Sequence, residues 1–204
     1  MRNICKGPCI LAARSKLMMK RAFDSIFALV LLIVFCIPVL VLALLVKLED
    51  GGPSFHWSKR VGLQGALFEM PKLRSMSVDT PQLATDLMTD PGRHLTQVGQ
   101  FLRKTSLDEL PQIYSVLVGK MSFVGPRPAL FNQYELIQAR QDLGINALLP
   151  GITGLAQING RDNISEQKKI EYDLMYLHKH SFLFDIQILA TTIFQVLARK
   201  SIAH

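Results

Sequence analysis

The sequence predicts an α+β fold that is mainly helical, in which a membrane element precedes a small domain with a short β-hairpin. Three observations support this prediction. An apolar run without a charged residue covers residues 25–46, and about 20 such residues are enough to cross the core of a bilayer. Short segments bounded by glycine follow the run. Several later segments have the apolar spacing of helices.

The composition indicates a membrane protein with a basic surface. The chain has 204 residues, of which 49% are hydrophobic and 19% charged, and its formal net charge is +7. A single soluble domain does not need so much apolar content. The apolar run is longer than the core of a secretory signal, which is about 7–15 residues, so we interpret it as a retained element. The basic balance suggests a phosphate-rich ligand or an anionic surface, and the three cysteines are too few for a disulfide framework.

Pro38 lies just past the middle of the apolar run. It must bend or break a helix there, because proline removes a hydrogen bond and clashes with the preceding turn. A kinked single span is one interpretation. The other is a re-entrant hairpin that enters and leaves by the same face. Lys and Arg flank the run on both sides, which favours two cytoplasmic ends but leaves both alternatives open.

The remaining elements are predicted from spacing and turn residues. Residues 54–62 and 66–76 are expected to form the hairpin, and residues 77–95 a polar loop with one helical turn. Helical spacing covers residues 99–104, 109–118 and 165–178. Residues 148–162 contain three glycines and a proline and are expected to be an irregular loop. The apolar segment 181–200 fits either a core helix or a helix lying on the membrane.

Asp108 and Glu109 form an adjacent acidic pair that is soon followed by Pro111. Ser106 and Glu109 fit a capping box, but Pro111 would then lie inside the helix and remove a hydrogen bond. A helix that starts at Asp108 instead places Pro111 in its first turn, where the missing N–H costs nothing. Only Leu110 could then donate to the Asp108 carboxylate, which is left partly free at the positive end of a helix.

Basic residues accompany the acidic pair. Arg127 lies between Pro126 and Pro128, which stiffen the backbone for bidentate recognition of phosphate. A plain turn with a solvated arginine is the simpler alternative. The other basic residues in similar settings are Arg103 and Lys104 just before the pair, Lys72 and Arg74 at the end of the hairpin, and Arg161 at the end of the glycine-containing loop.

These motifs occur together along the chain. They are KRAFD (20–24), the proline of the apolar run, RVG (60–62), KLRSM (72–76), RKTSLDELPQ (103–112), MSFVGPRP (121–128), PGITGLAQINGR (150–161) and EYD (171–173). The set resembles the bacterial sugar transferase family, the monotopic phosphoglycosyl transferases that begin glycan assembly on a polyprenyl phosphate carrier. The resemblance covers nearly everything from residue 20 to the C-terminus, and the set is far more specific than any single motif.

The resemblance implies transfer of a sugar-1-phosphate from a UDP-sugar to polyprenyl (undecaprenyl) phosphate, the first membrane step of a bacterial glycan. UMP would be released, with Mg²⁺ as cofactor. Asp108 maps onto the nucleophile, which forms a covalent phosphosugar intermediate, and Glu109 maps onto its acidic neighbour. The expected phosphate-binding residues are Lys72, Arg74, Arg103, Arg127 and Arg161, and the expected metal-binding residues are Asp108, Glu109 and Asp173. An aspartate with an ordinary pKa near 3.9 is ionised at neutral pH and needs no general base.

The resemblance also implies a membrane topology. Residues 1–19 are expected to be an N-terminal extension, and residues 20–50 a re-entrant helix-break-helix broken at Ile37 and Pro38. Residues 51–204 would form the catalytic domain with interfacial amphipathic helices, on the cytoplasmic face of the bacterial inner membrane. The expected partners are a UDP-sugar, polyprenyl phosphate and membrane phospholipid. No nucleic acid is expected, and a homodimer is allowed.

Three positions depart from the family pattern, and two other functions compete with the one it implies. Ile37 stands where serine is usual, Leu149 where arginine is usual, and Lys120 where an acidic residue is usual. A non-catalytic, membrane-anchored basic module could bind anionic lipid or nucleic acid, but it would leave Asp108 and Arg127 without a role. A glycosyl transferase that cleaves the sugar C–O bond would release UDP instead of UMP.

Overall fold

The computed structural model describes residues 8–80, 91–160 and 164–198. Its helices are α1 (Pro8–Asp50), α2 (Gln97–Thr105), α3 (Gln112–Leu117), α4 (Tyr134–Asp142), α5 (Leu155–Ile158), α6 (Glu166–Lys179) and α7 (Phe182–Leu197). Its strands are β1 (Phe55–Val61), β2 (Leu67–Leu73), β3 (Ser122–Val124) and β4 (Gly151–Thr153), and its 3-10 helices are η1 (Leu63–Gly65), η3 (Pro91–His94), η4 (Leu107–Glu109) and η5 (Ile145–Ala147). The described chain is thus mainly helical, as the sequence predicts, and it contains two small sheets.

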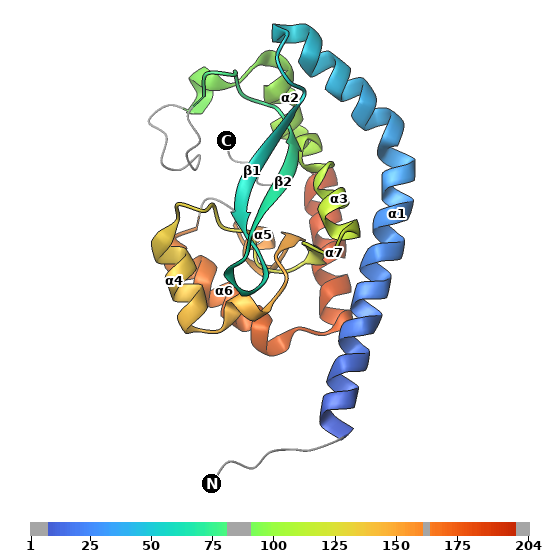
Figure 1. The fold of residues 1–204 in the computed structure, drawn as a ribbon, viewed down its shortest axis with the longest axis vertical. Helices are drawn as coiled ribbons and strands as arrows, with labels where there is room; N and C mark the ends of the chain where they lie inside the picture. The colour runs from blue at the N-terminus through green and yellow to red at the C-terminus, as the bar shows by residue number, and fades with distance from the viewer. Residues whose placement is uncertain (1–7, 81–90, 161–163, 199–204) are drawn as a thin grey trace.

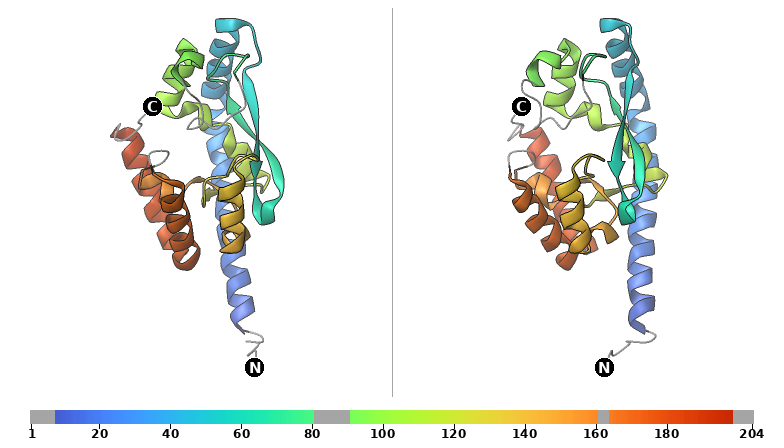
Figure 2. Two further views of the ribbon diagram at one scale, coloured as in Figure 1. Left: turned by 90° about the vertical axis from the view of Figure 1, so that its left-hand side faces the viewer. Right: turned by 60° about the vertical axis from the view of Figure 1, so that its left-hand side comes forward.

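The long helix α1 forms one edge of the molecule (Figure 1). The other elements pack against its middle and upper parts, and its N-terminal turns project beyond them. Helix α3 makes the most extensive contact with α1. Figure 2 places α6 and α7 on one side of the domain and the β1–β2 hairpin on the other. The predicted boundary between residues 20–50 and 51–204 is therefore crossed by packing contacts along much of α1.

Helix α1 runs without interruption from Pro8 to Asp50 and contains Pro38. The helix bends (Figure 1) but stays helical through Ile37 and Pro38, so the structure does not confirm the expected break at this position. Proline removes one N–H donor and crowds the preceding turn, and a bend relieves that clash while the flanking hydrogen bonds persist. The stretch Met18–Asp50 is long and apolar enough to cross a membrane. Its re-entrant path stays a prediction.

Strands β1 and β2 form a hairpin, which confirms the hairpin predicted for residues 54–62 and 66–76. The two strands pair antiparallel, with Phe55 opposite Leu73 at one end and Val61 opposite Leu67 at the other. The turn between them contains Gly65 at a φ of +80°, a left-handed conformation that glycine adopts without a steric penalty. This hairpin brings Lys72, near the end of β2, over the body of the domain.

A second, parallel sheet was not predicted. Strand β3 pairs with β4, and α5 follows β4 at once, so the prediction of an irregular loop over residues 148–162 is wrong in this part. The backbone that follows β3 lies close to β4, because a Cβ on Gly151 would overlap the backbone nitrogen of Gly125. The glycines that indicate a loop therefore permit a close backbone contact instead.

The main core joins α1 to the domain. Phe27 of α1 packs against Phe123 of β3, with ring centroids 5.0 Å apart, and Phe23 of α1 meets Phe182 of α7 edge to face at 5.4 Å. Val116 of α3 is completely buried among them. Lys20 of α1 adds an ion pair with Asp185 of α7. The C-terminal part of α1 also packs on the domain, since Ala43 and Val46 are buried in a second cluster with Leu73 and Leu102.

We expect Gly151→Ala to lower the free energy of unfolding by about 1–3 kcal/mol, because the added Cβ forces β3 and β4 apart. Chemical denaturation of the detergent-solubilised protein measures this change. Gly144→Asn is the matched control, because Gly144 has a φ of +71° and no atom lies within 4 Å of the point that an added Cβ would occupy, and asparagine tolerates such a φ. Equal stability of the two variants would contradict the prediction.

Candidate active site

A left-handed residue shapes the turn that carries the acidic pair. Ser106 has a φ of +59° and closes α2 as its C-cap, and the 3-10 turn η4 follows with Asp108 at its centre. Pro111 precedes α3, which begins at Gln112, so its missing N–H removes no helical bond. The prediction that Asp108 is a helix N-cap is therefore wrong, because the left-handed Ser106 separates the turn from α2 and α3 starts later.

The capping box proposed for Ser106 and Glu109 is also absent. Ser106 makes no side-chain capping bond, since it ends a helix instead of beginning one. The Glu109 side chain points to basic residues: Glu109 Oε1 accepts hydrogen bonds from Lys72 Nζ at 3.0 Å and from Arg127 Nη2 at 3.3 Å. Lys72 is 37 residues and Arg127 is 18 residues from Glu109 in the chain. Three separate segments thus converge on the acidic pair.

Arg103 adds a third basic group. It lies in the last turn of α2, where Nε donates to Ser75 Oγ at 3.0 Å and Nη2 lies 3.2 Å from Met76 Sδ. Its charge is close enough to act on the Asp108 carboxyl. The structure therefore brings together four of the residues predicted from the sequence around Asp108: Glu109, Lys72, Arg103 and Arg127.

The burial of this cluster changes its titration. Asp108 is only 7% exposed, and burial raises its pKa above the ordinary value; Lys72 opposes the increase, Glu109 adds to it, and Arg103 and Arg127 oppose it more weakly. Burial also lowers the pKa of Lys72, against the attraction of Glu109. The ordinary aspartate pKa expected from the sequence therefore does not hold in the folded protein. The basic groups around Asp108 favour its ionised form and so oppose the effect of burial.

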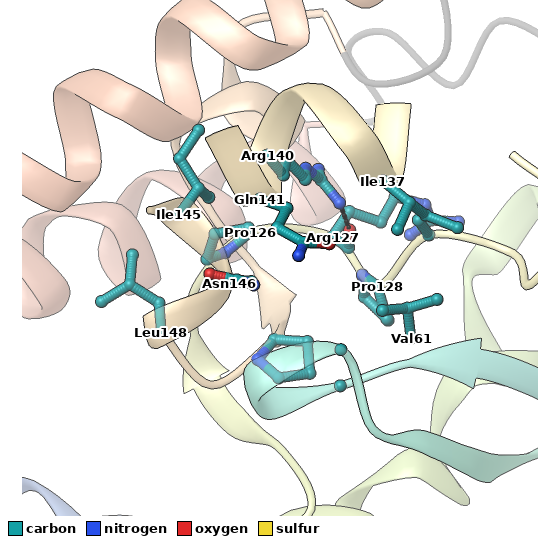
Figure 3. Close-up of a pocket in the computed structure, with 14 residues that line it drawn as sticks. Val61, Pro126, Arg127, Pro128, Ile137, Arg140, Gln141, Ile145, Asn146 and Leu148 are labelled. Carbon is teal, nitrogen blue, oxygen red and sulfur yellow. Dashed lines mark hydrogen bonds between the residues drawn. The ribbon is translucent and has the colours of Figure 1, made fainter. Parts of the chain in front are cut away.

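The segment that carries Arg127 is held by its backbone carbonyl groups. We call residues 125–129 the arginine loop. Two backbone N–H groups donate to carbonyl oxygens of this loop: Gly151 N to Pro126 O at 2.9 Å, and Val61 N to Ala129 O at 2.9 Å. Two arginine side chains also donate: Arg140 Nη1 to Arg127 O at 2.8 Å, and Arg60 Nη1 to Pro128 O at 3.2 Å. Figure 3 shows Arg140 pointing toward Arg127 from α4. These contacts add to the stiffness that the two prolines give.

Two predicted site residues have other partners in the structure. Arg74 Nη1 donates to Asp50 Oδ2 at 2.7 Å, at the C-terminal end of α1. Asp173 Oδ2 accepts from Arg140 Nε at 3.0 Å and also from Nη2. Arg161 lies outside the described residues. The phosphate-binding and metal-binding roles of these three residues stay predictions.

The acidic pair fits the ordinary requirements of Mg²⁺. Protein sites for Mg²⁺ commonly supply one or two carboxylates, and substrate phosphates and water supply the other ligands. Asp108 and Glu109 provide two carboxylates on one turn. No group of three or more His, Cys, Asp or Glu residues that could hold a metal ion occurs among the residues that the structure describes. A magnesium site here would therefore depend on the substrate for ligands.

A small pocket that is partly open to solvent lies beside the arginine loop. Figure 3 shows its walls: Pro126 and Pro128 of the loop, Arg140 and Gln141 of α4, and Asn146 and Leu148 near η5. The lining combines apolar surface with a few polar groups, which is typical of sites for small organic ligands. The pocket is lined by Arg127 but not by Asp108, Glu109 or Lys72, so it lies beside the acidic pair and does not include it.

Sequence reasoning missed Arg140 and Arg60, which hold the arginine loop, and Ser75, which holds Arg103. Arg140 lies four residues after the buried Leu136 on α4, and such spacing places both on one helix face. An arginine on a core-facing position is a signal of a buried ion pair. That signal becomes readable only once residues 134–142 are known to be a helix.

Comparison with known proteins places sugar transferases among the relatives of this chain. The chain is 40% identical over 186 residues to a sugar transferase, EpsL, of Bacillus subtilis, which covers 91% of both proteins. It is 38% identical over 192 residues to the UDP-glucose:undecaprenyl-phosphate glucose-1-phosphate transferase of Escherichia coli, covering 90% of this chain and 41% of that protein. It is 36% identical over 204 residues to the undecaprenyl-phosphate galactose phosphotransferase of Salmonella typhimurium, covering 93% and 42%.

The extent of the match decides the assignment. This chain spans nearly the whole of EpsL but less than half the length of the other two relatives. A family model described as bacterial sugar transferase matches residues 15–199, which include the acidic pair, the arginine loop and most of α1. This protein belongs to the bacterial sugar transferase family.

Proposed function

We propose that this protein transfers a sugar-1-phosphate from a UDP-sugar to polyprenyl phosphate and releases UMP. The names of the relatives from Escherichia coli and Salmonella typhimurium support the substrate classes, since both describe transfer to undecaprenyl phosphate. The observation that carries the proposal is the convergence of Asp108 and Glu109 with Lys72 and Arg127 in one buried cluster. Such a cluster can bring a carboxylate and a diphosphate together.

In the first step, an Asp108 carboxylate oxygen attacks the β-phosphorus of the UDP-sugar. The bond from that phosphorus to the bridging oxygen breaks, and UMP leaves with the bridging oxygen. The product on the enzyme is an acyl phosphate that joins Asp108 to the sugar-1-phosphate. No proton is transferred, because the ionised carboxylate is itself the nucleophile.

In the second step, a phosphate oxygen of polyprenyl phosphate attacks the same phosphorus. The bond to Asp108 breaks, and the carboxylate is restored. The product is polyprenyl diphosphate sugar. Because the same aspartate is used and regenerated, the two substrates can react in turn at one site, which is the pattern of ping-pong kinetics.

Charge compensation by the protein makes both steps feasible. An anionic nucleophile must approach an anionic diphosphate, and Lys72, Arg103 and Arg127 lie where they can offset that repulsion. Their side chains are held before substrate arrives, by Glu109 and by Ser75. Mg²⁺, held by Asp108 or Glu109 with the substrate phosphates, would supply further positive charge.

The membrane helix suits a lipid-linked acceptor. Helix α1 exposes many large apolar side chains along Met18–Asp50, while its inner face packs on the domain that carries Asp108. A polyprenyl phosphate keeps its tail in the bilayer, so a domain fixed to the membrane can meet its phosphate at the surface. We place the domain on the cytoplasmic face of the inner membrane, with α1 entering and leaving by that face.

Two other functions give different products. A membrane-anchored binding module would hold anionic lipid or nucleic acid without turnover, and its affinity would fall steeply with salt. A glycosyl transferase would break the sugar C–O bond and release UDP. Neither needs a buried acidic pair among basic residues, and a panel of UDP-sugars with polyprenyl phosphate, assayed for UMP and UDP, separates all three.

Incubation with the correct UDP-sugar in the absence of polyprenyl phosphate should give a protein that carries one sugar-1-phosphate on Asp108, detected by mass spectrometry. Asp108→Asn should lose the adduct and lower UMP release by at least roughly 10³-fold, since it removes the nucleophile. Asp142→Asn is the matched control, because this exposed carboxylate lies on α4 and accepts a hydrogen bond from Gln138 of the same helix. Full activity of Asp108→Asn would exclude the mechanism.

The rate of UMP release should fall on the acid side with a midpoint above about 4, the value of an ordinary aspartate. The reason is that burial raises the pKa of Asp108, so the nucleophile takes up a proton at a higher pH. Values of kcat/KM determined from initial rates between pH 4 and 8 measure this fall on the acid side of the pH profile. A rate that stays constant down to pH 4 would contradict the raised pKa.

The same shift predicts a stability effect at neutral pH. A group whose pKa is raised by folding contributes stability below its unfolded pKa and loses that contribution as the pH rises through its folded pKa. Ionised Asp108 should therefore destabilise the fold at pH 7, and Asp108→Asn should raise Tm. The difference in Tm between Asp108→Asn and the parent protein should shrink as the pH falls toward 4. Thermal unfolding of the two proteins at several pH values tests this.

A further inference from the structure

Arg140 joins two parts of the molecule through a buried guanidinium. Its Nε and Nη2 donate to Asp173 Oδ2 on α6, the first at 3.0 Å, and its Nη1 donates to the carbonyl oxygen of Arg127 at 2.8 Å. Arg140 is 9% exposed and Asp173 is 1% exposed. The charged pair therefore lies inside the protein, and one edge of the guanidinium faces the arginine loop.

A buried ion pair of this kind is not explained by stability alone. Two charges lose their hydration on burial, and apolar residues of similar size often stabilise a protein as well or better. An arginine paired with aspartate does supply a rigid, planar set of donors with fixed directions. Two donors bind Asp173, so the direction of the third, toward Arg127 O, is determined by that pair.

The carbonyl that Arg140 holds controls how Arg127 is presented. Pro126 and Pro128 fix their own φ angles, and Pro128 restricts Arg127 to extended conformations. The peptide plane between Arg127 and Pro128 can still tilt within that range. Arg140 removes this freedom through Arg127 O, and the Arg127 side chain then reaches Glu109 Oε1 at 3.3 Å, beside Lys72.

We propose that Arg140 and Asp173 are positioning residues that orient Arg127 toward the reacting phosphates. Asp173 acts as the buried partner of Arg140 in this arrangement and not as a metal ligand. The proposal rests on the proposed function for the role of Arg127, but the structural link from Asp173 through Arg140 to Arg127 can be tested without any substrate.

The main test is the double replacement Arg140→Met with Asp173→Leu. It removes both charges together, so no unpaired charge is left in the interior and the protein is expected to fold. We expect hydrogen–deuterium exchange to rise at the amides of Arg127 and Ala129 and to stay unchanged in α3. The controls are Asp142→Asn on α4 and Glu171→Gln on α6, two exposed carboxylates that contact neither Arg127 nor Arg140 through a hydrogen bond given by the structure.

A kinetic test separates positioning from a merely structural role. Arg140→Lys keeps the charge but not the fork of donors, and we expect it to lower kcat/KM for the UDP-sugar by about tenfold to a hundredfold. In an Arg127→Ala background the same change should have little further effect, because Arg140 acts through Arg127. Independent, multiplicative losses would overturn the proposal.

The magnesium dependence tests the role of Asp173. If Asp173 positions Arg140, the loss in Asp173→Asn persists at saturating Mg²⁺ and the concentration for half-maximal activity stays within about twofold of the parent. A loss that excess Mg²⁺ restores would make Asp173 a metal ligand and overturn the proposal. Unchanged exchange at Arg127 and Ala129 in the folded double variant would also overturn it. The exchange measurement needs no substrate, so it tests the positioning role even if the parent protein releases no UMP. Absence of UMP release would refute the proposed function and would leave the positioning role to be decided by the exchange measurement.

Discussion

The structure depends on the basic groups that surround two adjacent acidic residues in a place from which water is largely excluded. Asp108 is almost fully buried, and its neighbour Glu109 adds a like charge on the same short turn. Burial and repulsion both favour protonation. Lys72 and Arg127 oppose them by direct or close contact, and each comes from a different segment. The hairpin, α2 and the arginine loop can thus be understood as means of bringing positive charge to one turn.

Stiff backbone, more than side-chain packing, fixes where those charges lie. The left-handed Ser106 ends α2 so that Arg103 and Asp108 lie on successive short elements. The close approach of Gly151 to Gly125 brings β4 against the base of the arginine loop. Such positions tolerate little substitution, because an added Cβ or a changed φ would move a charged group. Preorganised charges are effective in catalysis because they need not rearrange as the reaction proceeds.

Local pattern in the sequence was sufficient for some of this and not for the rest. The hairpin was predicted because alternation and glycine encode it within about twenty residues. Asp108 was assigned as the nucleophile from the resemblance to the sugar transferase family, while the position of Pro111 indicated only that its carboxylate is partly free. The contact of Lys72 with Glu109 depends on how β2 lies over η4, which no local pattern records. Strands β3 and β4 have three residues each, too short for a periodic signal. Arg140 was missed because the helix that buries it was not predicted.

Helix α6 contacts both the end of β3, where α1 also binds, and the arginine that holds the arginine loop. Tyr176 and Asp173 are three residues apart and so lie on one face of α6. The Tyr176 hydroxyl lies 3.2 Å from Val124 O and 2.6 Å from Asp185 Oδ1, while Asp173 holds Arg140, which holds Arg127 O. The same helix face therefore fixes the chain just before the arginine loop and again within it. Lys20 of α1 also donates to Val124 O, at 3.3 Å. Helix α1 and helix α6 thus both donate to the carbonyl group of Val124, the last residue of β3, and the arginine loop follows this residue directly.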